Sequence, residues 1–287
     1  MKPLLSARSR IALVLTSSLV TAMVSSAATI HTRTNGNDNL PGTSWETAKR
    51  TVGAAVASAA TGDEIWVAEG IYHEQLELDR PVTLYGGFQG TETSSGERDS
   101  ATHRSILDGG GTGIVVSMRG GGGPRTLDGF TIQNGLNTGI YCLDTAFIIR
   151  SNIIRANLYG PRLAYGAGIH VRDVGNPAAA EIDHNLLLDN YALDGGAIAC
   201  IDASPRITHN TIAWNLAAQN GGGISCWRNS SPLIANNLFV ANSASLADAG
   251  MAVPVGGGAI FATADDLDGR PHPTAQSSPV ILNNLVA

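Results

Sequence analysis

The chain has 287 residues, of which 43% are hydrophobic and only 15% are charged, and it contains 34 glycines and a net charge of −6 at neutral pH. An acidic chain has no electrostatic footprint for DNA or RNA, which excludes a nucleic-acid partner. High glycine and low charge content favour a structure with many tight turns over an ordinary α/β domain.

Residues 1–27 are typical of a secretory signal peptide. Three basic residues precede an apolar run at 11–24, which is too short to cross a bilayer, and small residues follow it up to Ala27. We expect cleavage after Ala27 and a protein that is secreted or held at the cell surface. The mature chain then has no membrane span, and its net charge falls from −6 to −9 because three positive and no acidic residues are removed.

Residues 28–62 are predicted to form an N-terminal cap. Thr43 and Glu46 have the Thr-x-x-Glu spacing of a capping box at the start of a helix. An apolar stripe at helical spacing follows: Val52, Ala55, Val56 and Ala59. Gly62 then provides a helix stop. Such a helix would cover the open end of a repeat structure, whose strand edges otherwise pair with other chains.

From about residue 148 the chain repeats one pattern. An aliphatic residue is followed by Asn three positions later, an aliphatic residue two beyond it, and a second Asn five after the first. The pattern occurs at 149–157, 182–190, 207–215 and 234–242, and begins again at 281–287. The first Asn recurs at steps of 33, 25, 27 and 47 residues, which indicates a constant wall with variable loops. Asn tolerates left-handed turns, and stacked amides can hydrogen-bond along a ladder.

A glycine-led strand completes each unit. These strands read GIYCL (139–143), GIHVR (168–172), GAIACI (196–201), GGISCW (222–227) and GAIFAT (258–263). Their period of two indicates one buried face. Coils of short strands that stack on one another predict an all-β fold, a right-handed parallel β-helix over 63–287. Because the chain stops at Ala287 halfway through a coil, we expect a missing C-terminal cap or anchor.

The coils resemble the right-handed parallel β-helix repeats of the pectin-lyase-like superfamily. The block NGNDNLPGTSW…GIYHE (35–74) is similar to the N-terminal block of secreted bacterial β-helix proteins, and VTLYGGFQGTE (82–92) and SILDGGG (105–111) continue the similarity. The resemblance implies a secreted single-domain solenoid. It does not select an activity, because the superfamily contains lyases, hydrolases, esterases, epimerases and adhesins.

Alignment of the glycine-led strands places all three cysteines, Cys142, Cys200 and Cys226, in one inward column. We interpret them as small buried hydrophobes. No further ligand shares the column, and in-register side chains are poorly oriented for a disulfide. The neighbouring columns are expected to face outward and to form a polysaccharide-binding groove: Tyr141, His170, Arg172, Trp227 and Arg228.

Asp144, Asp173 and Asp202 form a further column in successive coils. Carboxylates about 4.8 Å apart repel one another, so a partly buried column needs a counter-ion, which calcium or a nearby arginine would supply. Alternatively, these aspartates are turn residues. The resemblance to pectate lyases implies calcium on the three aspartates, with Arg172 as the base that removes the sugar C5 proton. No cofactor is required otherwise.

His184 and His209 share the position just before the first Asn of their coils. Without a third ligand in the column, the pair favours a polar ladder over a zinc site.

This sparse chemistry favours an exported β-helix that binds or modifies extracellular polysaccharide through its outer wall, and it favours a binding protein over an enzyme. A calcium-dependent polysaccharide lyase and a structural stalk or adhesin passenger are the two alternatives.

Overall fold

The computed structural model describes residues 27–160, 165–173, 180–245, 257–263 and 276–287. The predicted signal peptide therefore lies outside the described residues, apart from Ala27. In the described ranges, no helix has the length and apolar character needed to span a membrane.

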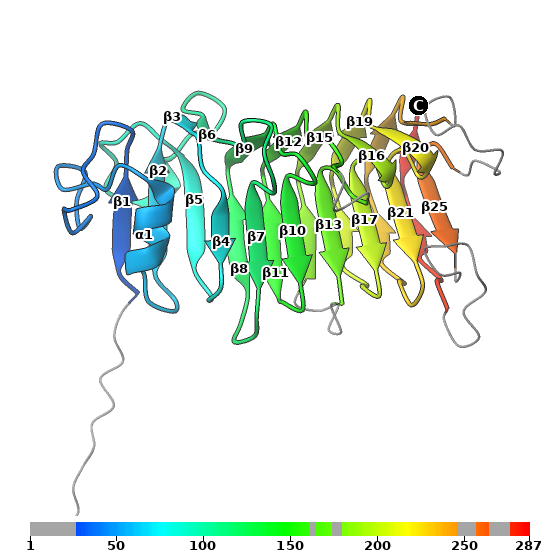
Figure 1. Ribbon diagram of the computed structural model, residues 1–287, viewed down its shortest axis with the longest axis horizontal. Helices are drawn as coiled ribbons and strands as arrows, with labels where there is room; N and C mark the ends of the chain where they lie inside the picture. The colour runs from blue at the N-terminus through cyan, green and yellow to red at the C-terminus, as the bar shows by residue number, and fades with distance from the viewer. Residues whose placement is uncertain (1–26, 161–164, 174–179, 246–256, 264–275) are drawn as a thin grey trace, which may run out of the picture.

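Short parallel strands stack into an elongated right-handed parallel β-helix, as the repeat predicts (Figure 1). Three long parallel sheets, named A, B and C, form the wall. Sheet A contains, in spatial order, β1 (Thr29–Thr32), β2 (Glu64–Ala68), β5 (Thr83–Phe88), β8 (Arg125–Asp128), β11 (Phe147–Arg150), β14 (Ala180–Asp183), β18 (Arg206–Thr208), β22 (Leu233–Ala235) and β26 (Val280–Leu282).

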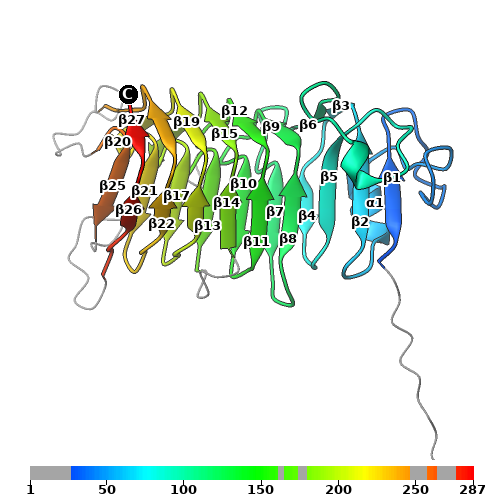
Figure 2. The same ribbon diagram turned by 180° about the vertical axis from the view of Figure 1, so that it is seen from behind.

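Sheets B and C complete each coil. Sheet B contains β3 (Gly70–Tyr72), β6 (Ser105–Asp108), β9 (Phe130–Gln133), β12 (Ile153–Arg155), β15 (Leu186–Leu188), β19 (Thr211–Ala213), β23 (Leu238–Val240) and β27 (Leu285–Val286). Sheet C contains β4 (Leu76–Leu78), β7 (Val116–Arg119), β10 (Ile140–Leu143), β13 (Ile169–Arg172), β17 (Ile198–Ile201), β21 (Ile224–Trp227) and β25 (Ile260–Thr263). Figure 1 looks onto sheet C, and Figure 2 shows the molecule from behind.

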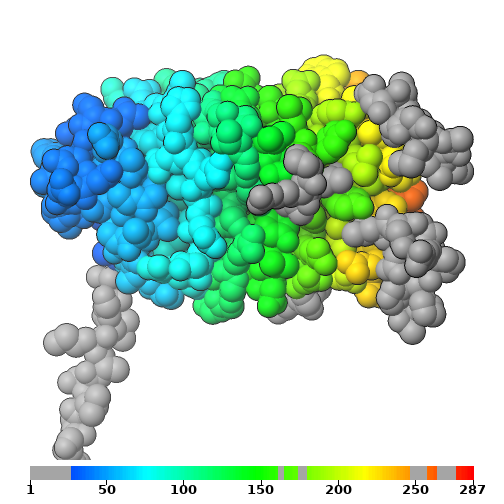
Figure 3. Space-filling view, viewed as in Figure 1, coloured from blue at the N-terminus to red at the C-terminus, as the bar shows by residue number. Residues whose placement is uncertain are grey.

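Two smaller features lie outside these sheets. A short fourth sheet, D, contains β16 (Tyr191–Asp194), β20 (Leu216–Asn220) and β24 (Ser243–Ala244). One turn of 3-10 helix, η1, covers Ser95–Glu97. In the space-filling view of Figure 3, the coils follow one another along the long axis in chain order, so position along the axis follows position in the sequence.

The core lies inside the coils and consists of stacked aliphatic rows. Ile140, Ile169, Ile198 and Ile224 are in register in sheet C, and all four are fully buried. The three cysteines are also buried, and each is a free thiol, with Cys200 in register with Cys226. Their interpretation as core residues is confirmed.

The corners between sheets A and B turn through a left-handed residue that stands just before each ladder asparagine. His184, His209 and Asn236 have φ of 54°, 54° and 58°. The asparagines that follow them point inward and are hydrogen-bonded from coil to coil, for example Asn185 to Asn210. The ladder was predicted, but the left-handed conformation belongs to the residue before the Asn rather than to the Asn itself.

The N-terminal helix, α1 (Val52–Ser58), packs onto the first coils and buries Val52, Ala55 and Val56. Its apolar stripe is confirmed, whereas the capping box at Thr43 is wrong. Thr51 is the N-cap, and its hydroxyl accepts a hydrogen bond from the amide of Ala54.

A long-range contact explains where α1 begins. The carboxylate of Glu74, from the first coil, accepts hydrogen bonds from the amides of Val52 and Gly53 at 2.9 and 2.7 Å. These are two of the amides that the start of a helix leaves unpaired. β1 lies within the segment expected to be a separate cap, yet it pairs with β2 as the first strand of sheet A.

Candidate functional site

The outer face of sheet C carries the column in which we predicted substrate-binding residues. In spatial order the column reads Glu77, Ser117, Tyr141, His170, Ala199, Ser225 and Phe261. The register agrees with the sequence alignment from Tyr141 to Phe261. It also extends the column by two coils toward the N-terminus.

The middle of this column is covered. Tyr141, His170 and Trp227 are only 6%, 1% and 5% exposed. The ring of Tyr165 packs on His170 and Trp227, with centroid distances of 6.2 and 6.5 Å. The prediction of an open groove along these coils is therefore wrong. Alternation in a strand gives the direction of a side chain, but not what lies above it.

The covered part of the wall contains polar atoms without partners. Within the described ranges, both ring nitrogens of His170, Oγ of Ser225 and Nε1 of Trp227 are buried and make no hydrogen bond. Burial, helped by the positive charge of Arg172, lowers the pKa of His170 to about 3. The imidazole is therefore neutral at physiological pH, and its ring packs edge-on to that of Tyr141 at 5.1 Å.

The aspartate column occupies turns. Asp144, Asp173 and Asp202 have φ of 46°, 55° and 50°, in the left-handed region that Asp and Asn tolerate better than most residues. This backbone conformation agrees with the alternative that these aspartates are turn residues. Among the described residues, none of these aspartates belongs to a group of three or more His, Cys, Asp or Glu side chains whose ligand atoms all lie within 4.8 Å of one another. Calcium at this column remains an untested prediction.

The arginines expected in the groove are paired with these aspartates. Nε of Arg172 lies 3.2 Å from Asp173, and Nη2 of Arg228 lies 3.0 Å from Asp202. Each of these two arginines therefore has a counter-ion from the protein. The Arg172 guanidinium is thus engaged by Asp173, whereas the lyase hypothesis needs it beside the sugar C5 proton.

An open cleft lies at the N-terminal half of the same column. It has a volume of about 550 Å³ and is lined by side chains from β4, β7 and β10 and from the loops before them. Its polar and aromatic lining consists of Gln75, Glu77, Ser117, Arg119, Asn137 and Tyr141. Tyr141 is the one predicted binding residue that reaches this cleft.

The lining of the cleft is partly preorganised. The Arg119 guanidinium lies over the Tyr141 ring, 5.2 Å from its centroid, and its Nε donates to Oγ of Ser117 at 2.9 Å. Oδ1 of Asn137 is buried without a hydrogen-bond partner in the described part of the chain. Both Arg119 and Glu77 are exposed, and within that part neither forms an ion pair with a protein group at 4.0 Å or less.

The cleft continues toward the helix. A second hollow of about 350 Å³ is lined by residues of α1 together with Asp79 and Arg80. Gln75, Leu76 and Glu77 line both hollows, so the two adjoin across β4. Together they form a polar depression that crosses the first coils of the solenoid.

Comparison with known proteins gives a family match over most of the chain. A family described as "Protein of unknown function (DUF1565)" matches residues 34–268. The chain belongs to this family. No curated protein and no solved structure matches the chain. The DUF1565 match includes the whole cleft, from Gln75 to Tyr141.

The cleft residues Glu77, Ser117 and Arg119 were missed from the sequence. The Asn pattern that sets the register begins only at about residue 148, so the earlier coils were not aligned. A signal was nevertheless present in this DUF1565 chain. LEL (76–78) and VSMR (116–119) alternate with period two and align with IYCL of β10.

Proposed function

We propose that this DUF1565 protein is an exported β-helix that binds extracellular polysaccharide in the cleft formed by β4, β7 and β10. One observation carries the proposal. Glu77, in register with Ser117, and Arg119, two residues along the strand of Ser117, stand exposed beside an aromatic ring in a hollow of about 550 Å³. Among the described residues, neither has a protein counter-ion. Binding sites for small polar ligands combine a concave surface with a few convergent polar groups.

The chemistry of the lining suits a sugar chain. A pyranose offers hydroxyl groups around its edge and C–H groups on its faces, so it needs both hydrogen-bonding and apolar partners. Glu77 accepts hydrogen bonds from hydroxyls, and the Asn137 side chain adds an amide to the lining of the cleft. Arg119 presents a planar set of donors that fits carboxylates especially well. We therefore favour a polymer that contains uronic acids.

Export supports an extracellular partner. The proposal of secretion or surface location rests on residues 1–27, whose pattern is that of a signal peptide. The acidic mature chain is poorly suited to nucleic acid. A polysaccharide outside the cell is a partner that such a protein would meet.

The two alternative functions have less support. For a lyase, Arg172 is paired with Asp173 and is not among the residues that line the cleft. A structural stalk would need only the stacked coils, and the charged cleft would have no role in it. Binding accounts for both the wall and the cleft.

The test is binding to a panel of polysaccharides by affinity electrophoresis or calorimetry. Uronic-acid polymers such as pectate and alginate are compared with neutral glucans and with buffer. We expect retention by at least one uronic-acid polymer, and a loss of about tenfold or more in R119Q and in E77Q. Arg155→Gln is the matched control, because Arg155 is exposed on sheet B and, among the described residues, its guanidinium pairs only with Gln133.

Absence of binding across the panel, or equal binding by R119Q and wild type, would overturn the proposal. Release of unsaturated products would instead show the lyase activity.

A further inference from the structure

A compact group of three potential metal ligands lies on the opposite wall, at the corner between sheets A and B. Asp183 is the last residue of β14, His184 follows it, and His209 stands in the same turn one coil further on. Within the described residues it is the one group of three or more His, Cys, Asp or Glu side chains whose ligand atoms lie within 4.8 Å of one another.

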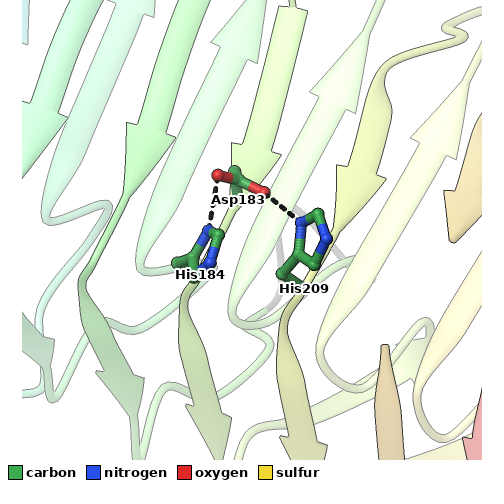
Figure 4. A group of neighbouring side chains, drawn as sticks. All are labelled: Asp183, His184 and His209. Atoms are coloured by element: carbon green, nitrogen blue, oxygen red, sulfur yellow. Dashed lines mark hydrogen bonds and ion pairs between the residues drawn. The ribbon is translucent and has the colours of Figure 1, made fainter. Parts of the chain in front are cut away.

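The left-handed turns create this juxtaposition. His184 and His209 both have φ of 54°, so the backbone places their side chains alike in successive coils. Their rings are stacked, with centroids 4.8 Å apart and an interplanar angle of 21°. Figure 4 shows both rings turned toward the carboxylate of Asp183.

Both histidines use the same nitrogen toward this carboxylate. Nδ1 of His184 lies 2.6 Å from Oδ2 of Asp183, and Nδ1 of His209 lies 3.0 Å from Oδ1 (Figure 4). Three ligand atoms on a tetrahedral zinc ion, each about 2.0–2.1 Å from the metal, stand about 3.3 Å apart. The observed spacing is slightly shorter, so small rotations of two half-exposed rings would admit an ion.

The carboxylate has no permanent counter-ion from lysine or arginine. Among the described residues, the groups within 4.0 Å that could carry a positive charge beside Asp183 are the two histidines. Arg150 is its in-register neighbour in sheet A, but the Arg150 guanidinium is held by Asp128 at 2.6 Å. Asp183 is therefore available to an added cation.

Neighbouring side chains contact two of these potential ligands, Asp183 and His209. The Thr208 hydroxyl donates to Oδ1 of Asp183 at 2.6 Å. Nδ2 of Asn236 lies 3.3 Å from Nε2 of His209, and a half-turn of that amide would place its oxygen there to accept a hydrogen bond from Nε2. In the rotated orientation the proton stays on Nε2, and Nδ1 of His209 is left free for a metal.

We propose that Asp183, His184 and His209 bind a divalent transition-metal ion of the zinc type. Two imidazoles and one carboxylate suit zinc and its neighbours rather than calcium, which prefers oxygen ligands. Three protein ligands at a partly exposed corner leave further coordination positions to water or to a ligand from solution.

The experiment is a zinc titration of the chain, free of any histidine tag and treated with chelator, followed by calorimetry. We expect one equivalent of Zn²⁺ to bind and no heat with Ca²⁺. H184Q and H209Q should each weaken binding by about tenfold or more. All the substituted side chains are solvent-accessible, so the variants should keep the circular dichroism spectrum and melting temperature of the wild type.

His103→Gln is the matched control, because His103 contacts one carboxylate, Glu69, and no second histidine in the described structure. It should bind zinc like the wild type. No zinc binding by the wild type, or equal binding by the wild type and by H209Q, would overturn the proposal. Neither result depends on polysaccharide binding at the cleft, because the substituted residues are outside it.

Discussion

The side-chain amide of Asn185 donates from Nδ2 to Oδ1 of Asn210 at 3.0 Å, and the backbone amide of Asn185 donates to the same oxygen at 2.9 Å. The same double contact recurs from coil to coil. One ladder runs through Asn152, Asn185, Asn210, Asn237 and Asn284, and a second through Asn157, Asn190, Asn215 and Asn242. Each link is also bonded to a backbone carbonyl, so the buried corners have their polar groups satisfied.

Replacing one asparagine of a ladder should therefore lower the free energy of unfolding substantially. Asn210 is 1% exposed, and its Nδ2 donates to the carbonyl of Ile182 as well as to Asn237. In N210A, the backbone amide of Asn185 loses its acceptor, and Nδ2 of Asn185 keeps only its bonds to the carbonyls of Ile149 and Asp183. We expect the free energy of unfolding to fall by about 2–5 kcal/mol, since each buried group left unpaired costs about 1–3 kcal/mol. Urea unfolding measures this change.

Asn229 provides the control for the ladder. It is exposed and donates to Asp202 at 3.0 Å. N229A should lose less than about 1 kcal/mol, because water replaces an exposed hydrogen bond. Similar losses in N210A and N229A would contradict the role given to the ladder.

The Asn pattern explains why so much of the fold is predictable. A solenoid repeats its local signals, so the pairing of Ile140 with Ile169 and of Ile169 with Ile198 follows from aligning the sequence with itself. What lies over the wall is not periodic. Tyr165, which buries His170 and Trp227, belongs to a loop between coils, and no repeat predicts where such a loop folds.

The candidate sites were predictable only in part. His184 and His209 were recognised as a column, but their third partner, Asp183, precedes the turn and was not aligned with them. A left-handed residue turns the chain from sheet A into sheet B and brings the strand's last outward side chain beside the ring that follows. Aligning the repeats position by position places Asp183 and the histidines in different columns. Such an alignment does not show that the turn folds the next residue back beside the end of the strand.

Arg125 gives a second stability prediction. It faces the interior at a position in register with Phe147, is fully buried, and donates to the carbonyls of Leu78, Gly123, Asp79 and Gly121. Lysine has one donor group and cannot reach four carbonyls. We expect R125K to lower the free energy of unfolding by about 2–4 kcal/mol. An exposed substitution, Arg155→Lys, should leave the midpoint of urea unfolding unchanged.

His170 and Asp194 give opposite dependences of stability on pH. Burial lowers the pKa of His170 to about 3, below the value of about 6.5 in an unfolded chain. The unfolded state therefore binds more protons between these values, and the His170 contribution is lost as pH falls. Burial, partly offset by hydrogen bonds from Asn220, raises the pKa of Asp194 to about 6. Below that pH the native state holds the additional proton, so the Asp194 contribution is lost as pH rises from about 4 to about 6.

The two effects should largely cancel between pH 4 and 6, and single variants should reveal each. In D194N, unfolding free energy should decline by up to about 1.4 kcal/mol per pH unit more than in the wild type as pH falls from 6 to 4. In His170→Phe, which keeps an aromatic ring against Tyr141, the trend relative to wild type should reverse. Urea unfolding at several pH values measures both slopes. Parallel curves for all three proteins would contradict these ionisation states.

Processing of the N-terminus gives a prediction outside the described structure. When the whole chain is expressed in a bacterium, mass spectrometry of the exported protein should find Ala28 as its first residue, because the small residues before it suit signal peptidase. Replacing Ala27 with a bulky residue should block cleavage. Recovery of the uncleaved wild-type chain from the cytoplasm would argue against export.

The stacking described for the sheets also determines how the two proposed sites communicate. Among the described strands, each one is hydrogen-bonded only to its neighbours in the same sheet, so stability along such a stack is carried largely by nearest-neighbour terms between coils. A ligand in the cleft would therefore slow amide hydrogen exchange in its own and adjacent coils, and the effect would fade along the axis. Asp183 and His184 lie one coil beyond Tyr141, because β14 pairs with β11, the strand that follows β10. Occupancy of the cleft and occupancy of the two histidines would then be linked through one interface between coils, with a small coupling free energy.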